Sequence, residues 1–124
     1  MPATERSLDL ARTAAAAADE KLATTIAGID VSEQLALTDA FVIVSASSDR
    51  QVGAIVDEVE DQLRLKGAKP IRREGERDGR WVLLDFGDIV VHVQHDEERE
   101  FYELERLWKD CPEIDLGVPK RREA

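Results

Sequence analysis

The residues of this chain that could do chemistry are few. Its two histidines, His92 and His95, stand three positions apart near the end of one predicted strand. Side chains at that separation point to opposite faces of a pleated strand, which is poor geometry for binding one metal ion. The single cysteine, Cys111, has no nearby histidine in sequence and no second thiol for a disulfide or a metal cluster. We therefore predict no catalytic residue, no metal site and no cofactor, and we expect His92 to have a structural or interface role.

Two aspartates could form a carboxylate pair. Asp85 and Asp88 flank a predicted turn at Phe86 and Gly87. Such a pair can bind magnesium together with substrate phosphates, or divide the roles of acid and base. An aspartate in a tight turn more often accepts a hydrogen bond from its own backbone. We favour that structural role, or an interface role, over a metal site.

A polar stretch at residues 47–51, SSDRQ, precedes an apolar periodic segment. Helix N-termini attract anions, and Arg50 would add positive charge there. Ser48 followed by Gln51 is also the pattern of a capping box, in which each side chain satisfies a free backbone N–H group. Because capping accounts for Ser48, we favour it over an anion site.

Trp81 is the most informative aromatic residue. It begins a predicted strand in which Trp81 and Leu83 share one face and Val82 and Leu84 share the other, so both faces are apolar. One face must belong to the core. The other is covered by the first or last helix, or it contacts a second molecule, and periodicity leaves both possibilities open. Tryptophan is enriched among the residues that dominate binding energies, which favours contact with a partner.

Composition restricts the kind of partner. The 124 residues suit one domain, and 27 acidic residues against 17 basic ones give a formal net charge of −10. This charge disfavours binding to nucleic acid unless a local basic patch overcomes phosphate repulsion, and it suits a basic protein. No apolar run approaches the roughly 20 residues that span a bilayer, and the N-terminus lacks the apolar block of a signal peptide. We expect a cytoplasmic protein without membrane contact.

The order of elements predicts an α/β domain with helices packed on a mixed five-stranded sheet, in the order α-β-β-α-β-β-β-α. The predicted helices and strands, in order, cover residues 4–22, 26–31, 40–46, 48–66, 69–73, 80–85 and 88–94, followed by a last helix from residue 96. In that last helix Phe101, Leu104 and Trp108 form the inward stripe. Strand 40–46, the helix after it and strand 69–73 form a crossover with parallel strands. We expect one domain with an ordered core over residues 4–112 and a mobile tail over residues 113–124.

Motifs in a fixed order resemble the ribosomal silencing factor family, RsfS or Iojap. The stretches are Thr38 and Asp39 before FVI at 41–43, SDRQV at 48–52, Glu74 and Gly75, WVLLD at 81–85, GDIVVH at 87–92 and REFYELERLW at 99–108. The resemblance covers about residues 8–110. The chain departs from the family pattern at Ala40, and at Gln94 and His95, where the family often has aromatic residues.

The resemblance implies a mixed-sheet domain that binds the large ribosomal subunit. Family members dock on its L-fourteen-group protein, block joining of the small subunit and repress translation when nutrients are short, and they can form homodimers. The resemblance also implies roles for particular residues. The docking strand would present Trp81, Leu83 and Asp85. Its hairpin partner would present Asp88 and His92, and Glu74 would meet basic side chains of the ribosomal protein.

Two other functions stay open. A nucleotidyltransferase-like enzyme would need a carboxylate cluster for magnesium, and the only close pair is Asp85 with Asp88. A purely structural homodimer would bury the Trp81 face between two copies.

Overall fold

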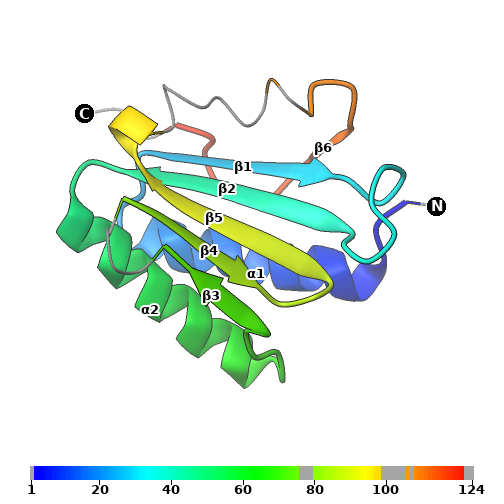
Figure 1. The fold of residues 1–124 in the computed structure, drawn as a ribbon, viewed down its shortest axis with the longest axis horizontal. Coiled ribbons are helices and arrows are strands. Elements are labelled where there is room, and N and C mark those ends of the chain that lie inside the picture. The colour runs from blue at the N-terminus through cyan, green and yellow to red at the C-terminus, as the bar shows by residue number, and fades with distance from the viewer. Residues whose placement is uncertain (1, 76–79, 99–105, 107, 122–124) are drawn as a thin grey trace.

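The computed structural model describes residues 2–75, 80–98, 106 and 108–121. Its elements are α1 (Glu5–Glu20), β1 (Thr25–Asp30), β2 (Ala40–Ala46), α2 (Asp49–Leu65), β3 (Arg72–Glu74), β4 (Trp81–Asp85), β5 (Ile89–His95) and β6 (Glu113–Ile114). The strands form one mixed sheet in the order β3-β4-β5-β2-β1-β6, and α1 and α2 lie side by side on one face of it (Figure 1). The predicted α/β class with helices on a mixed sheet is confirmed. The sheet has six strands where five were predicted.

Helix α1 begins close to its predicted start, directly after the capping residue Thr4. The hydroxyl of Thr4 accepts a hydrogen bond from the backbone N–H of Ser7. Asp39, from the loop before β2, accepts further hydrogen bonds from the Thr4 N–H at 3.1 Å and the Ser7 hydroxyl at 2.8 Å. The buried face of the helix is mostly alanine, so its backbone can approach the sheet and α2 closely.

Helix α2 has the predicted N-cap at Ser48, with one change. The Ser48 hydroxyl accepts from the Gln51 N–H at 3.1 Å, but the Gln51 side chain accepts from Ser47 and not from Ser48. The same amide donates to the carbonyl of Leu22 at 2.7 Å, which ties the start of α2 to the end of α1. Gly67 adopts a φ of +82° just after the helix, where glycine is favoured.

The sheet topology follows from one crossover and one hairpin. β4 and β5 form the predicted antiparallel hairpin, and β5 pairs in parallel with β2 at the centre of the sheet. β3 runs in the same direction as β2, as the crossover predicts, but two strands lie between them, and β3 pairs with β4. The strand that follows α2 is therefore at the edge of the sheet, and it covers Arg72–Glu74 where residues 69–73 were predicted.

The prediction of a mobile tail from residue 113 is wrong for residues 113–121. β6 pairs antiparallel with β1, and the N–H of Ile26 donates to the carbonyl of Lys120 at 2.8 Å. Ile114 and Leu116 are only 9% and 7% exposed and belong to the main core. Gly28 makes this packing possible, because a Cβ at that position would lie 3.0 Å from the Leu116 side chain.

Apolar side chains gather on both faces of the sheet. The larger cluster lies between the sheet and the two helices, and it includes Leu10, Val44, Leu63 and Leu84. A second cluster on the opposite face joins Ile29, Val31, Phe41, Ile43 and Val90 to the partly buried Leu35, Trp81, Leu83, Trp108 and Cys111.

Little of the predicted last helix can be compared with the structure. Asp96 to Glu98 and Arg106 are helical, whereas Phe101 and Leu104 lie outside the described residues. In the part of the chain that the structure describes, no helix has both the length and the apolar character to cross a membrane.

Candidate interaction surface on the sheet

The alternation along β4 decides the position of Trp81. Val82 and Leu84 are buried beneath the helices, while Trp81, Leu83 and Asp85 point to the opposite face and are partly exposed. Neither α1 nor α2 covers Trp81, because both helices lie on the other side of the sheet (Figure 1). We call the surface formed by Phe41, Trp81, Leu83, Asp85 and His92 the aromatic face.

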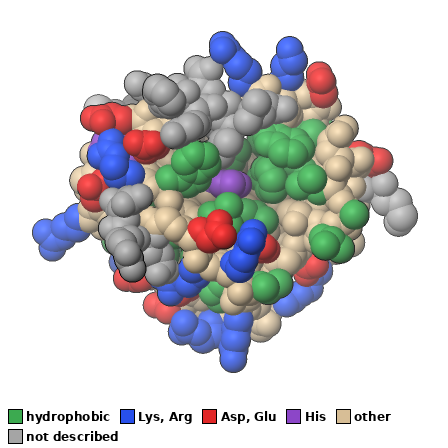
Figure 2. Space-filling view, viewed as in Figure 1, with side chains coloured by type: hydrophobic (Ala, Val, Ile, Leu, Met, Phe, Trp, Pro, Cys, Tyr) green, Lys and Arg blue, Asp and Glu red, His purple; other side chains and the backbone are tan. Residues whose placement is uncertain are grey.

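His92 lies at the centre of the aromatic face. Its Nδ1 accepts a hydrogen bond from the indole N–H of Trp81 at 3.3 Å. The ring of Phe41 meets the imidazole edge-on with centroids 5.2 Å apart, and Phe41 meets Trp108 in the same way at 5.1 Å. Figure 2 shows hydrophobic side chains gathered near the middle of this side of the molecule. The rings hold one another in place, so the aromatic face is preorganised.

Burial keeps His92 neutral. The ring is 7% exposed, and the loss of solvent lowers its pKa from 6.5 to about 4. Since Nδ1 accepts from Trp81, the proton of the neutral ring is on Nε2. Among the described residues, none forms a hydrogen bond with Nε2. His92 is therefore a poor general base at neutral pH, and it is suited to a packing or interface role.

The two histidines do not form a pair. His95 accepts a hydrogen bond from the N–H of Glu97 at its own end of β5, as the strand alternation predicts for residues three apart. Within residues 2–75, 80–98, 106 and 108–121, no group of three or more metal-binding side chains comes together.

The aspartates of the hairpin turn have separate roles. Asp85 accepts a hydrogen bond from the N–H of Gly87 at 2.9 Å, which is the predicted turn role, and its other oxygen lies 3.8 Å from a guanidinium nitrogen of Arg72. Asp88 is exposed in the turn, and its backbone carbonyl accepts from the N–H of Asp39. Asp85 and Asp88 thus stabilise the turn and its surroundings, and both leave negative charge at this end of the hairpin.

Glu74 lies at the edge of the same surface. On β3 it is paired with Leu83 of β4, and Arg72 of β3 is paired with Asp85. The Glu74 side chain is exposed and lies 3.6 Å from Arg72. The structure therefore brings together Glu74, Trp81, Leu83, Asp85 and His92, and it places Asp88 at the nearby turn.

Three residues in or beside the aromatic face were not predicted to lie there. The sequence predicts Phe41 and Arg72 only as members of strands, and it predicts Trp108 on the inward stripe of the last helix. The position of Phe41 could have been inferred from the two-residue period of β2, whereas the contact of Trp108 joins segments far apart in the sequence.

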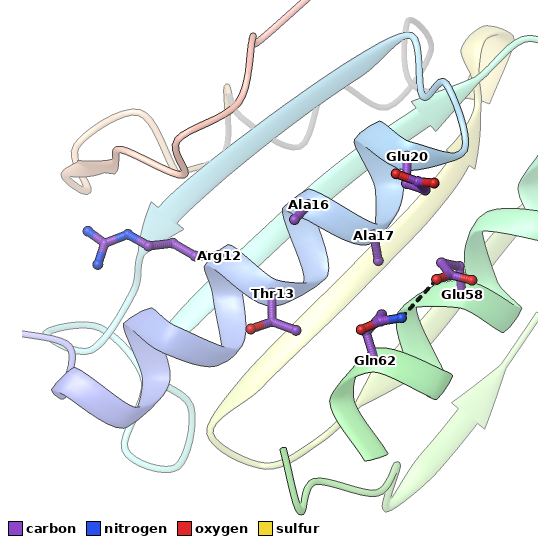
Figure 3. Close-up of a pocket in the computed structure, with 7 residues that line it drawn as sticks. All are labelled: Arg12, Thr13, Ala16, Ala17, Glu20, Glu58 and Gln62. Atoms are coloured by element: carbon purple, nitrogen blue, oxygen red, sulfur yellow. Dashed lines mark hydrogen bonds between the residues drawn. The ribbon is translucent and has the colours of Figure 1, made fainter. Parts of the chain in front are cut away.

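A groove lies between helices α1 and α2, away from the aromatic face. Arg12, Thr13, Ala16 and Ala17 of α1, with Glu20, line a groove of about 490 Å³ whose other side is Glu58 and Gln62 of α2 (Figure 3). Gln62 donates a hydrogen bond to Glu58 across one turn of α2. The groove follows from the small alanine side chains of α1, and its polar residues form no arrangement suited to catalysis.

Comparisons with known proteins agree with the predicted family. The model of the family described as "Ribosomal silencing factor during starvation" matches residues 4–124. The ribosomal silencing factor RsfS of Bacillus subtilis is 46% identical over 103 residues, which are 83% of this chain and 87% of that protein. A mouse protein named "Mitochondrial assembly of ribosomal large subunit protein 1" is 36% identical over 64% of this chain and 36% of its own length. A crystal structure from Chromobacterium violaceum matches with a TM-score of 0.78 and 29% identity, covering 90% of this chain and 92% of that one.

Proposed function

The chain belongs to the ribosomal silencing factor family, and from that membership we propose that it binds the large ribosomal subunit in the cytoplasm and prevents the small subunit from joining. The protein contacted is the L-fourteen-group ribosomal protein. The result is repression of translation when nutrients are short. The name of the mouse relative, which refers to the large ribosomal subunit, supports this choice of partner.

The observation that carries the proposal is the partly exposed Trp81. A half-buried indole surrounded by Leu83, Phe41 and His92 gives a partner an apolar contact of fixed shape. Tryptophan at such a position commonly dominates the energy of an interface. Because the hydrogen bond to His92 already orients the indole, little side-chain entropy is lost on binding.

Charge at the edge of the aromatic face suits a basic ribosomal protein. Glu74 and Asp88 are exposed and Asp85 is partly exposed, and they lie beside or just beyond Leu83 on β3, β4 and the hairpin turn. Complementary charge at a rim increases the rate of association and disfavours wrong partners. The apolar centre and the acidic edge together have the usual composition of a protein interface.

The proposed mechanism is steric. A domain of this length has an expected radius of gyration of roughly 14 Å, which is large enough to keep two subunit surfaces apart. No bond is made or broken, so catalytic groups are not needed. Repression then depends only on the fraction of large subunits that carry the protein.

Co-sedimentation with purified large subunits tests the proposal. Trp81→Ala should weaken binding by on the order of 2 kcal/mol, or roughly thirtyfold in Kd. Leu22→Ala, at an exposed position just after α1, is the matched control and should bind like the unchanged protein. Equal binding by both variants would contradict the proposal, as would unhindered joining of small subunits to saturated large subunits.

A structural homodimer predicts a different result. If two copies buried Trp81 between them, light scattering would give a dimer that Trp81→Ala converts to a monomer. Large subunits added to that dimer would leave its mass unchanged. Subunit binding by a monomer, with loss of any dimer on binding, favours the proposed function.

A further inference from the structure

One short segment of this acidic protein is strongly basic. Between residues 64 and 73 every charged residue is positive: Arg64, Lys66, Lys69, Arg72 and Arg73. The rest of the chain contains all 27 acidic residues and only 12 basic ones. Positive charge is thus concentrated where α2 ends and β3 begins.

Four of these side chains face solvent. Arg64, Lys66 and Arg72 have 59%, 46% and 60% of their side chains exposed, and Lys69 is also exposed. Arg73 differs, because its guanidinium lies 2.9 Å from the nearly buried carboxylate of Glu60 on α2. We call Arg64, Lys66, Lys69 and Arg72 the basic rim.

The ion pairs of the basic rim leave its charge available. Arg64 lies 3.2 Å from Asp61 and Lys66 lies 3.4 Å from Asp9, and in each pair both groups are about half exposed. Exposed pairs of this kind contribute little and exchange readily for other partners. Positive side chains near the end of α2 also suit the helix dipole, but Lys69 and Arg72 lie beyond the helix and are not explained by it.

The basic rim meets the edge of the aromatic face at Arg72. Arg72 is paired with Asp85 across β3 and β4, and its guanidinium lies 3.8 Å from that carboxylate. Figure 2 shows Lys and Arg side chains along the lower edge of the face that has the histidine at its centre. Arg72 therefore lies where the basic rim meets the aromatic face, whereas Arg64 and Lys66 lie at the end of α2, on the helix side of the sheet.

We propose that the basic rim binds backbone phosphates of the large-subunit RNA next to the docked ribosomal protein. This inference rests on the proposed function. The acidic edge of the aromatic face suits a basic protein, but a basic rim would be repelled by the same protein. A large ribosomal subunit presents phosphates beside its proteins, and Lys and Arg side chains on an exposed segment bind phosphates without reading sequence.

Matched charge variants test the proposal. The rim variant carries Arg64→Gln, Lys66→Gln and Lys69→Gln, and it keeps Arg72, which borders the aromatic face. The control variant carries Arg12→Gln, Arg50→Gln and Lys120→Gln, which remove the same charge at exposed positions elsewhere. Binding of each is measured over a range of salt with three probes: large subunits, the isolated L-fourteen-group protein and a plain RNA duplex.

The rim variant should bind large subunits at least about tenfold more weakly than the control variant. The slope of log K against log salt should be shallower by about two to three, since each of the three lost phosphate contacts removes about 0.7–0.9 from the slope. Affinity for the isolated ribosomal protein should be unchanged. At low salt the unchanged protein and the control should bind the RNA duplex weakly, and the rim variant should lose this binding.

Other results would overturn the proposal. Equal losses in the rim and control variants would show an effect of net charge alone. A matching loss for the isolated ribosomal protein would assign the basic rim to a protein contact. If the unchanged protein did not bind the RNA duplex, the proposed phosphate contact would be rejected, regardless of the affinity for large subunits. Rim-dependent RNA binding without subunit binding would instead contradict the proposed function and support the phosphate chemistry of the basic rim.

Discussion

The indole N–H of Trp81 on β4 donates a hydrogen bond to Nδ1 of His92 on β5 across 3.3 Å. The two residues are diagonal neighbours, because Trp81 is paired directly with Gln94 and His92 with Leu83. Diagonal neighbours on one face of a sheet come within reach when their side chains are long or aromatic. The bond orients the indole and determines that the proton of His92 is on Nε2. A surface residue and a buried one are thereby coupled.

Trp81→Phe should separate the hydrogen bond from the aromatic contact. The substitution keeps a large ring on the aromatic face and removes the N–H donor, leaving Nδ1 of His92 without its partner. We expect the free energy of unfolding to fall by about 1 kcal/mol and subunit binding to weaken less than in Trp81→Ala. Urea unfolding and co-sedimentation measure the two effects, and binding as weak as that of Trp81→Ala would show that the ring alone is not enough.

Stability should fall as pH decreases from about 6.5 to 4. His92 has a pKa of about 4 in the folded protein and an ordinary value near 6.5 when unfolded, so in this window the unfolded chain binds more protons. The contribution is complete above pH 6.5 and is lost as pH falls towards 4, to a maximum of roughly 3 kcal/mol.

Urea unfolding between pH 7 and pH 4 measures this dependence. His92→Gln removes the titrating ring and should flatten the curve over the window. An equally steep curve in His92→Gln would assign the effect to other groups. The imidazole NMR signals of His92 should show the ring mostly neutral at pH 5, with about a tenth protonated.

Gly75→Ala should disturb the docking strand. Gly75 has a φ of +83°, and a Cβ there would lie 1.9 Å from the backbone carbonyl oxygen of Trp81. We expect destabilisation of about 1–3 kcal/mol together with weaker subunit binding, because the start of β4 must move. Gly53→Ala is the matched control, since Gly53 lies in α2 with nothing near its added Cβ, and it should stabilise by up to about 1 kcal/mol. If both variants were equally stable, the close approach would not matter.

Leu116→Ala should destabilise the protein although it lies near the C-terminus. Leu116 is buried in the main core against Gly28, and truncating such a leucine costs about 2–5 kcal/mol. Leu65→Ala, at an exposed position on α2, should change the free energy of unfolding by less than about 0.5 kcal/mol. Thermal unfolding compares the two. A small effect of Leu116→Ala would mean that residues 113–121 contribute little to the fold.

The sequence by itself determined the local features of this protein. The start of α1 near Thr4 and the cap of α2 at Ser48 depend on groups within a few residues of one another. The hairpin of β4 and β5 and the two faces of β4 follow from a turn and a two-residue period, which are also local. The family motifs indicated which face of that hairpin to test for contact with a partner.

Tertiary structure alone decided which distant segments meet. β6 pairs with β1, and Leu116 packs tightly against Gly28, which lies 88 positions earlier in the chain. The contact of Phe41 with Trp108, the parallel pairing of β2 with β5 and the position of Arg72 beside Asp85 likewise join segments that are separate in the sequence. Local patterns specify caps, turns and faces because these need only neighbouring atoms. Pairing across the sheet depends on the packing of the whole chain, which no single stretch of sequence contains.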